Sequence, residues 1–115
     1  MEYYILKNSP TEAVIKVYET SNSGGTSDIA LSALAENGET ITNAYIKEMM
    51  WSCKPNKSVH VSRLNGVEEE GTYYLANADH WHFLNFHDET YSNLPFRFVF
   101  DGQGTVVIRV RKIVA

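Results

Sequence analysis

The last twenty residues alternate between apolar and other side chains with a period of two, which is typical of a β-strand with one buried face. Phenylalanine occupies positions 96, 98 and 100, and the apolar residues Val106, Ile108 and Val110 repeat the same period after a short gap. Gly102 and Gly104 lie in that gap. The stretch therefore predicts two strands joined by a tight turn.

The simplest arrangement of these two strands is an antiparallel hairpin. Residues directly opposite each other in such a pair share a face, so the apolar sets must match. The predicted pairs are Phe100 with Val106, Phe98 with Ile108, Phe96 with Val110, and Asp101 with Thr105. The register leaves residues 102–104 as a three-residue loop, in which we expect Gly104 to adopt the left-handed conformation of a G1 bulge.

The rest of the chain is also rich in short β-prone segments separated by turn residues. We predict further strands at residues 3–6, 11–19, 28–35, 41–53, 58–64, 72–76 and 80–86. Segment 28–35 is ambiguous, because Asp28 can cap a helix and alanine-rich runs form helical turns. Segment 41–53 has helical spacing at Ile46, Met49 and Met50, but we favour a long strand that is bulged near Lys47-Glu48. Eight or nine such strands predict one all-β domain over residues 1–115, an antiparallel β-sandwich (jelly-roll-like) or a small closed barrel.

Composition limits the classes of function. A net charge of −4 spread along 115 residues argues against broad binding to nucleic acid, which requires a basic surface. Cys53 is the single cysteine, so no intramolecular disulfide is expected, and its apolar surroundings favour an inert thiol. The first residues lack the pattern of a signal peptide, and no apolar run is long enough to span a membrane. We expect synthesis in a cytoplasm, no membrane partner, no cofactor and no enzymatic activity.

The sharpest candidate for chemistry is His80-Trp81-His82. Residues i and i+2 of a strand point to the same side, so both imidazoles can approach one metal ion, with His60, Asp79 or His87 as further ligands. A zinc site needs three or four convergent ligands, and the favoured interpretation is that the histidines face solvent or a neighbouring subunit. Aromatic residues form 12% of the chain and are either core or the lining of a carbohydrate groove.

A second candidate is a basic surface on the outer face of the predicted terminal hairpin. Arg97, Arg109, Arg111 and Lys112 lie on that face or at its end. One interpretation is a docking surface for an acidic partner. The other is that these cations protect an edge strand from aggregation.

Four segments together resemble the small β-sandwich virion proteins encoded by marine tailed bacteriophages. They are the strand 14–18, the Ser/Gly/Thr/Asp loop 23–28, the strand 46–52 and the ending 101–112 with its terminal basic residues. The region 68–93, with its His-Trp-His, departs from that pattern. The resemblance carries over no functional residue.

The resemblance implies a structural role in a virion, as a decoration (cement) protein on the capsid exterior. Its partner would be the major capsid protein, bound by a homo-oligomer, for which we expect a trimer. The alternative is a carbohydrate- or receptor-binding module on the virion surface. The residues that we expect to form the contact surface are Ser23, Thr26, Trp81, Arg97, Arg109 and Arg111.

Overall fold

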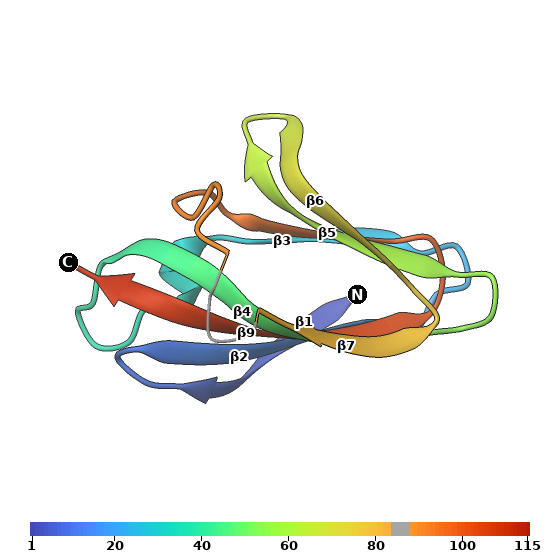
Figure 1. Cartoon of the computed structure of the whole chain (residues 1–115), viewed down its shortest axis with the longest axis horizontal. Coiled ribbons are helices and arrows are strands. Elements are labelled where there is room, and N and C mark those ends of the chain that lie inside the picture. The colour runs from blue at the N-terminus through green and yellow to red at the C-terminus, as the bar shows by residue number, and fades with distance from the viewer. Residues whose placement is uncertain (84–87) are drawn as a thin grey trace.

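The computed structural model describes residues 1–83 and 88–115, which form two antiparallel sheets packed face to face (Figure 1). The five-stranded sheet has the order β1 (Glu2–Asn8), β2 (Glu12–Glu19), β9 (Gly104–Val114), β4 (Ile41–Cys53) and β7 (Ala78–His82). The four-stranded sheet has the order β3 (Gly25–Ile29), β8 (Phe96–Phe100), β5 (Ser58–Asn65) and β6 (Glu68–Ala76). The predicted all-β sandwich of eight or nine strands is confirmed, and the alternative of a closed barrel is not.

The core lies between the two sheets and follows the period-two pattern of the sequence. Every second residue of β2, β8 and most of β9 is buried, as expected for strands with one face against the core. The largest fully buried side chains include Phe96, Phe98, Ile15, Met49 and Ile108. The inward faces predicted for the last two strands are therefore confirmed.

The predicted pairing of those two strands is wrong. β8 pairs with β3 and β5 in the four-stranded sheet, whereas β9 pairs with β2 and β4 in the other sheet. Residues 101–103 thus connect the two layers instead of closing a hairpin. Two strands that face each other across a core bury the same alternate residues as two strands side by side, so the alternation does not distinguish these arrangements.

Hydrogen bonds at the connection show why it crosses between the layers. The backbone N–H of Ser58 donates to the Asp101 carboxylate at 2.6 Å, which ties Asp101 to the start of β5. Thr105 pairs instead with Tyr18 and Ser52 in the other sheet. Gly104 is not among the residues with positive φ, so the predicted G1 bulge is also wrong. A Cβ at Gly104 would lie 3.2 Å from the Cys53 sulfur, and this close approach explains the glycine.

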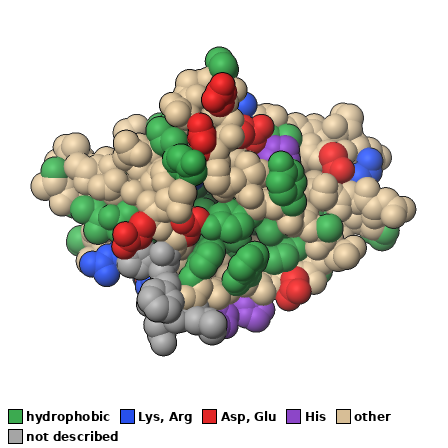
Figure 2. All heavy atoms as spheres, turned by 45° about the horizontal axis from the view of Figure 1, so that its top comes forward, with side chains coloured by type: hydrophobic (Ala, Val, Ile, Leu, Met, Phe, Trp, Pro, Cys, Tyr) green, Lys and Arg blue, Asp and Glu red, His purple; other side chains and the backbone are tan. Residues whose placement is uncertain are grey.

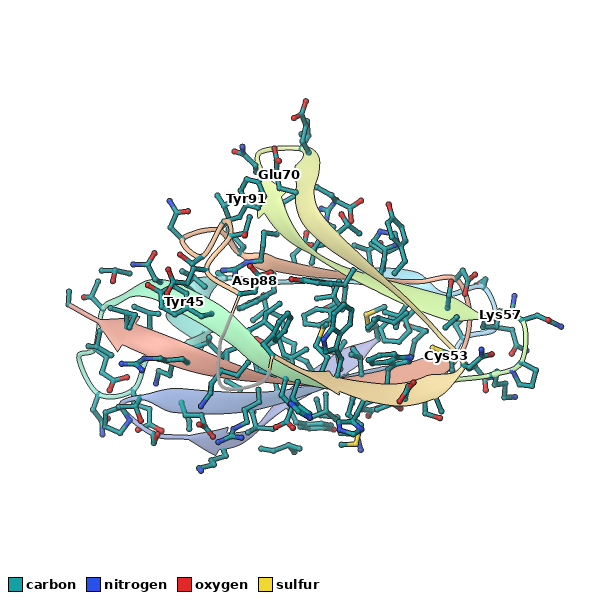
Figure 3. The ribbon with its side chains drawn as sticks, in the orientation of Figure 1. Tyr45, Cys53, Lys57, Glu70, Asp88 and Tyr91 are labelled. Carbon is teal, nitrogen blue, oxygen red and sulfur yellow. The ribbon has the colours of Figure 1, made fainter. Side chains whose placement is uncertain are left out.

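β4 is the long strand that the sequence predicts, and it runs along the long axis of the molecule. Tyr45 lies towards one end and Cys53 at the other (Figure 3). Its pairing with β9 shifts register between Ile46 and Glu48, which is the predicted bulge. A strand this long contacts both β9 and β7, and it forms the support for the β7 edge.

Two other segments differ from prediction. Residues 28–35 divide into the end of β3 and one turn of 3-10 helix, η1 (Leu31–Leu34), so the strand prediction for the whole segment is wrong. Ile29 and Leu31 alternate as in a strand, but the buried Leu31 and Leu34 are three residues apart, which is the spacing of a helical turn. The predicted strand 72–76 begins earlier, at Glu68, because β5 and β6 form a hairpin with the two-residue loop Gly66-Val67. The tip of this hairpin projects from the body (Figure 1).

The predicted strand 80–86 is β7 as far as His82, and residues 84–86 lie outside the described part of the chain. Within the described residues, no helix has the length and apolar character needed to cross a membrane.

Candidate functional site

The chain passes from the four-stranded to the five-stranded sheet at Asn77, between β6 and β7. Asn77 has a φ of 62°, the left-handed conformation that asparagine tolerates better than most residues. The indole N–H of Trp51 donates to the Ala76 carbonyl at 2.9 Å, and the N–H of Cys53 donates to the Asn77 carbonyl at 2.7 Å. β4 therefore holds the start of β7 in place, at one open side of the sandwich.

Three aromatic side chains fill this open side, and we call Tyr73, Trp81 and Phe83 the aromatic cluster. Trp81 and Phe83 are stacked with ring centroids 5.7 Å apart, and Tyr73 meets each of them edge-on at 6.0 Å. Such geometries are favourable for aromatic pairs and hold the rings in fixed positions. The side chain of Trp81 is nevertheless 49% exposed. Figure 2 shows hydrophobic side chains gathered in the middle of this side of the molecule.

Asp88 fixes the position of Tyr73. It lies between the projecting hairpin and the five-stranded sheet (Figure 3), where its N–H donates to the Ile46 carbonyl at 2.8 Å. The Tyr73 hydroxyl donates to the Asp88 carboxylate. Burial, together with this carboxylate, raises the pKa of Tyr73. The hydroxyl is therefore a permanently protonated link between β6 and the segment that begins at residue 88.

Arg63 anchors the same segment from within the core. Its guanidinium donates to the carbonyls of Ala44 and Ser92, each at 2.9 Å, and to that of Leu94 at 3.0 Å from Nε. The guanidinium also lies 3.9 Å from the centroid of the Phe96 ring. Burial lowers the pKa of Arg63 to about 10, so the side chain is charged at neutral pH. A buried cation held by carbonyls fixes residues 92–94 against β4 and β5.

The six contact residues expected from the sequence lie in three separate places. Thr26 and Arg97 share the outer face of the four-stranded sheet, and Ser23 lies in the turn before β3. Arg109 and Arg111 lie on the outer face of the five-stranded sheet, and Trp81 lies at the β7 edge. The continuous basic face that the hairpin register predicts does not exist, because β8 and β9 belong to opposite layers.

Two of the three arginines, Arg97 and Arg109, are also engaged by carboxylates of the same chain. Arg97 forms a two-bond pair with Asp28, with N···O distances of 2.7 and 2.9 Å, and this pair lowers the pKa of Asp28. Arg109 binds Glu12 in the same way at 2.7 and 3.0 Å, and hydrogen bonding to Arg109 lowers the pKa of Glu12 to about 2. Neutralised arginines attract an acidic partner less than free ones.

Lys112 is not on the outer surface as predicted, because it is 2% exposed. Its ammonium group donates to Asn8 Oδ1 at 2.6 Å, to the Ser9 carbonyl at 2.9 Å and to Glu39 Oε1 at 3.1 Å. Position 112 continues the alternate series Val106, Ile108 and Val110, so the period of two by itself predicts that Lys112 faces the core. Arg63 continues the alternate series Val59 and Val61 in the same way. This position in the period of two is the sequence signal that could have predicted both buried cations.

The outer face of the five-stranded sheet has two adjoining hollows, of about 250 and 540 Å³. Both include Met50, His80 and Val107, and Met50 is 55% exposed. The Arg109–Glu48 ion pair, at 3.3 Å, borders the smaller hollow, and Asp79 lines the larger one. An apolar floor of this kind suits contact with another surface more than chemistry on a small substrate.

The histidines do not converge as a metal site would require. His80 and His82 share one side of β7, as predicted, with ring centroids 5.7 Å apart. His60 lies in the other sheet and is hydrogen-bonded to Glu69 at 2.9 Å. In the described part of the chain, no group of three or more metal-ligating side chains comes together, and His87 lies outside that part.

Sequence reasoning identified Trp81 but missed its partners Tyr73 and Phe83 as members of one site.

No protein-family model matches the chain, and no curated protein matches it in sequence.

Proposed function

We propose that this protein is a binding protein of a tailed-phage virion, a decoration protein that docks on the capsid lattice and stabilises it as a homo-oligomer. The observation that carries the proposal is the aromatic cluster: three rings held in fixed geometry, with Trp81 half-exposed at the edge of a sheet. Half-exposed aromatic anchors on a rigid scaffold are typical centres of binding energy in protein interfaces.

The proposal places the docking surface on the aromatic cluster and no longer on the arginines. Arg97 and Arg109 already have carboxylate partners, whereas about half of the surface of Trp81 is exposed and available for contact. In a symmetric oligomer each copy contributes the same contact, so moderate contacts sum to strong attachment to a lattice. The resemblance to phage virion proteins supplies the identity of that lattice.

Sedimentation with capsids that lack the protein tests this function. We expect the wild-type protein to sediment with expanded capsids and to raise the temperature at which they are disrupted. Trp81→Ala removes a central anchor, which costs about 2 kcal/mol or more in typical interfaces, or about a thirtyfold loss of affinity. Failure of the wild type to bind capsids, or unchanged binding by the variant, would refute the proposal.

Tyr74→Ala is the matched control for that experiment. Tyr74 neighbours Tyr73 in the chain and is 81% exposed, but it pairs with His60 on the outer face of the four-stranded sheet. We expect this variant to bind capsids like the wild type. A thermal melt of each variant checks that the fold is retained.

The exposed rings also favour a second candidate function, the binding of a carbohydrate or receptor glycan. Burial of all the Trp and Tyr rings would have removed this candidate, but Trp81 and Tyr74 are both exposed. Sugars stack on such rings. Titration of the intrinsic tryptophan fluorescence with neutral oligosaccharides tests it, and an unchanged spectrum at millimolar sugar would exclude it.

A further inference from the structure

The free edge of β7 is a second feature of the same site. β7 ends the five-stranded sheet, and in the described part of the chain it pairs with β4 alone. All five of its residues are exposed. A sheet edge of this kind presents backbone N–H and C=O groups to which a further strand can add. One of them, the N–H of His80, donates to the Asp79 carboxylate at 2.8 Å, and an added strand would replace that bond.

The edge of β7 lacks features that interrupt the edge strands β1 and β6. The fourth edge strand, β3, also pairs regularly, but it is partly buried, whereas all of β7 is exposed. The pairings of edge strands β1 and β6 are interrupted by irregularities, between Ile5 and Lys7 and opposite Val61–Arg63. The pairing of β7 with β4 is regular from Glu48 to Ser52. Bulges and lysines are common means of preventing strand addition, and β7 carries neither. This edge is therefore a suitable template for a partner strand.

The two strands that carry Tyr73 and Trp81 contain acidic side chains and no lysine or arginine. Asp79 lies two residues before Trp81 in β7, where its carboxylate accepts from the N–H of His80, and Asp88 contacts Tyr73 directly. β6 begins with three glutamates. Figure 2 shows carboxylates on several sides of the hydrophobic centre. This charge favours a cationic partner, and the exposed Trp81 ring is the best aromatic platform for a cation.

We propose that an extended partner segment carrying Lys or Arg adds to β7 as a sixth strand and places a cation against Trp81. The inference rests on the docking function proposed above and names the chemistry of the partner. A second copy of this chain is a poorer occupant, because antiparallel pairing of two β7 strands would bring the acidic surroundings of both copies together. A basic segment gains from the same charges.

Peptide binding tests the strand addition without the capsid. The probe is a fluorescein-labelled peptide of eight residues that alternates Lys and Val, measured by fluorescence anisotropy against the whole protein. Two control peptides replace Lys by Glu, or replace two alternate valines by proline, which cannot supply the backbone N–H. We expect binding of the Lys peptide alone, weakened at higher salt because charge contributes.

Protein variants locate the site of this binding. We expect Trp81→Ala and Asp79→Asn each to weaken the Lys peptide about tenfold or more, and Tyr74→Ala to bind it like the wild type. Equal binding of the Glu or proline peptide, or unchanged binding by Trp81→Ala, would overturn the proposal. Sedimentation velocity that shows self-association lost in Trp81→Ala would overturn it in favour of a second copy.

Capsid sedimentation in the presence of excess Lys peptide separates this inference from the docking function. Displacement of the protein from capsids by the peptide supports both. Capsid binding by a protein that neither binds the peptide nor is displaced by it leaves the docking function standing and refutes strand addition. Peptide binding without capsid binding refutes the capsid as partner and leaves strand addition standing.

Discussion

Replacement of Arg63 by methionine is the most direct test of how the segment behind the aromatic cluster is held. The guanidinium donates to the carbonyls of Ala44, Ser92 and Leu94 and packs on the ring of Phe96. Methionine retains most of the apolar stem but no donor. The three carbonyls then lose a hydrogen bond, and the ring loses its cation.

The expected loss can be worked from these contacts. A buried acceptor left without a donor costs about 1–3 kcal/mol. The Ala44 carbonyl lies in the core, whereas Ser92 and Leu94 are partly exposed, so water can replace the donor there in part. The ring contact adds about 1 kcal/mol, and removal of a buried charge offsets some of the total. We expect Arg63→Met to lower the free energy of unfolding by about 3 kcal/mol, and the melting temperature by about 10 °C.

Urea unfolding followed by tryptophan fluorescence measures this change, and Arg97→Met is the matched control. Arg97 lies on the adjacent strand β8, but its pair with Asp28 is on the surface, where ion pairs contribute about 1 kcal/mol or less. The reasoning is refuted if Arg63→Met loses less than about 1 kcal/mol, or no more than the control.

Three further predictions concern other parts of the fold. Gly24→Ala should lower the free energy of unfolding by several kcal/mol, because its Cβ would lie 2.0 Å from the Phe100 carbonyl oxygen. Gly38→Ala has open space around it and should cost about 1–2 kcal/mol, for the left-handed backbone alone. Equal losses of the two variants in urea unfolding would contradict this. Hydrogen bonding to Arg109 lowers the pKa of Glu12 from 4.5 to about 2, so the contribution of Glu12 to stability is present above pH 4.5 and is lost as the pH falls towards 2. Glu12→Gln should therefore flatten the dependence of the unfolding free energy on pH between 4.5 and 2. An unchanged dependence would contradict this. Burial raises the pKa of the Cys53 thiol, so Ellman's reagent at pH 8 should react more slowly with the native than with the urea-unfolded protein.

The long strand β4 shows how far local reasoning reaches. Its extent and the bulge near Lys47-Glu48 follow from the residues of the segment itself, because strand propensity and a change in apolar parity are local properties. Segment 28–35 shows the limit. Ile29 and Leu31 alternate as in a strand, and packing of Leu34 into the core decides for the turn.

The aromatic cluster could be predicted only in part. The pattern around His80-Trp81-His82 indicates a strand with Trp81 on the side opposite the histidines, and the structure places the residues in that way. Tyr73 is eight residues away and belongs to the other sheet. Its approach to Trp81 depends on the crossing at Asn77 and on Asp88, and no short-range pattern encodes that combination.

The sequence by itself determined which residues of each strand face the core, because the period of two is a property of extended backbone. This holds even for Lys112, which lies two residues after the buried Val110 and is itself buried. Only the tertiary structure decided which strands are neighbours. Backbone hydrogen bonds are alike for any antiparallel pair, so the choice depends on long-range packing and on ties such as Ser58 to Asp101. That choice separated Arg97 from Arg109, and it brought Tyr73 and Trp81 together at one edge.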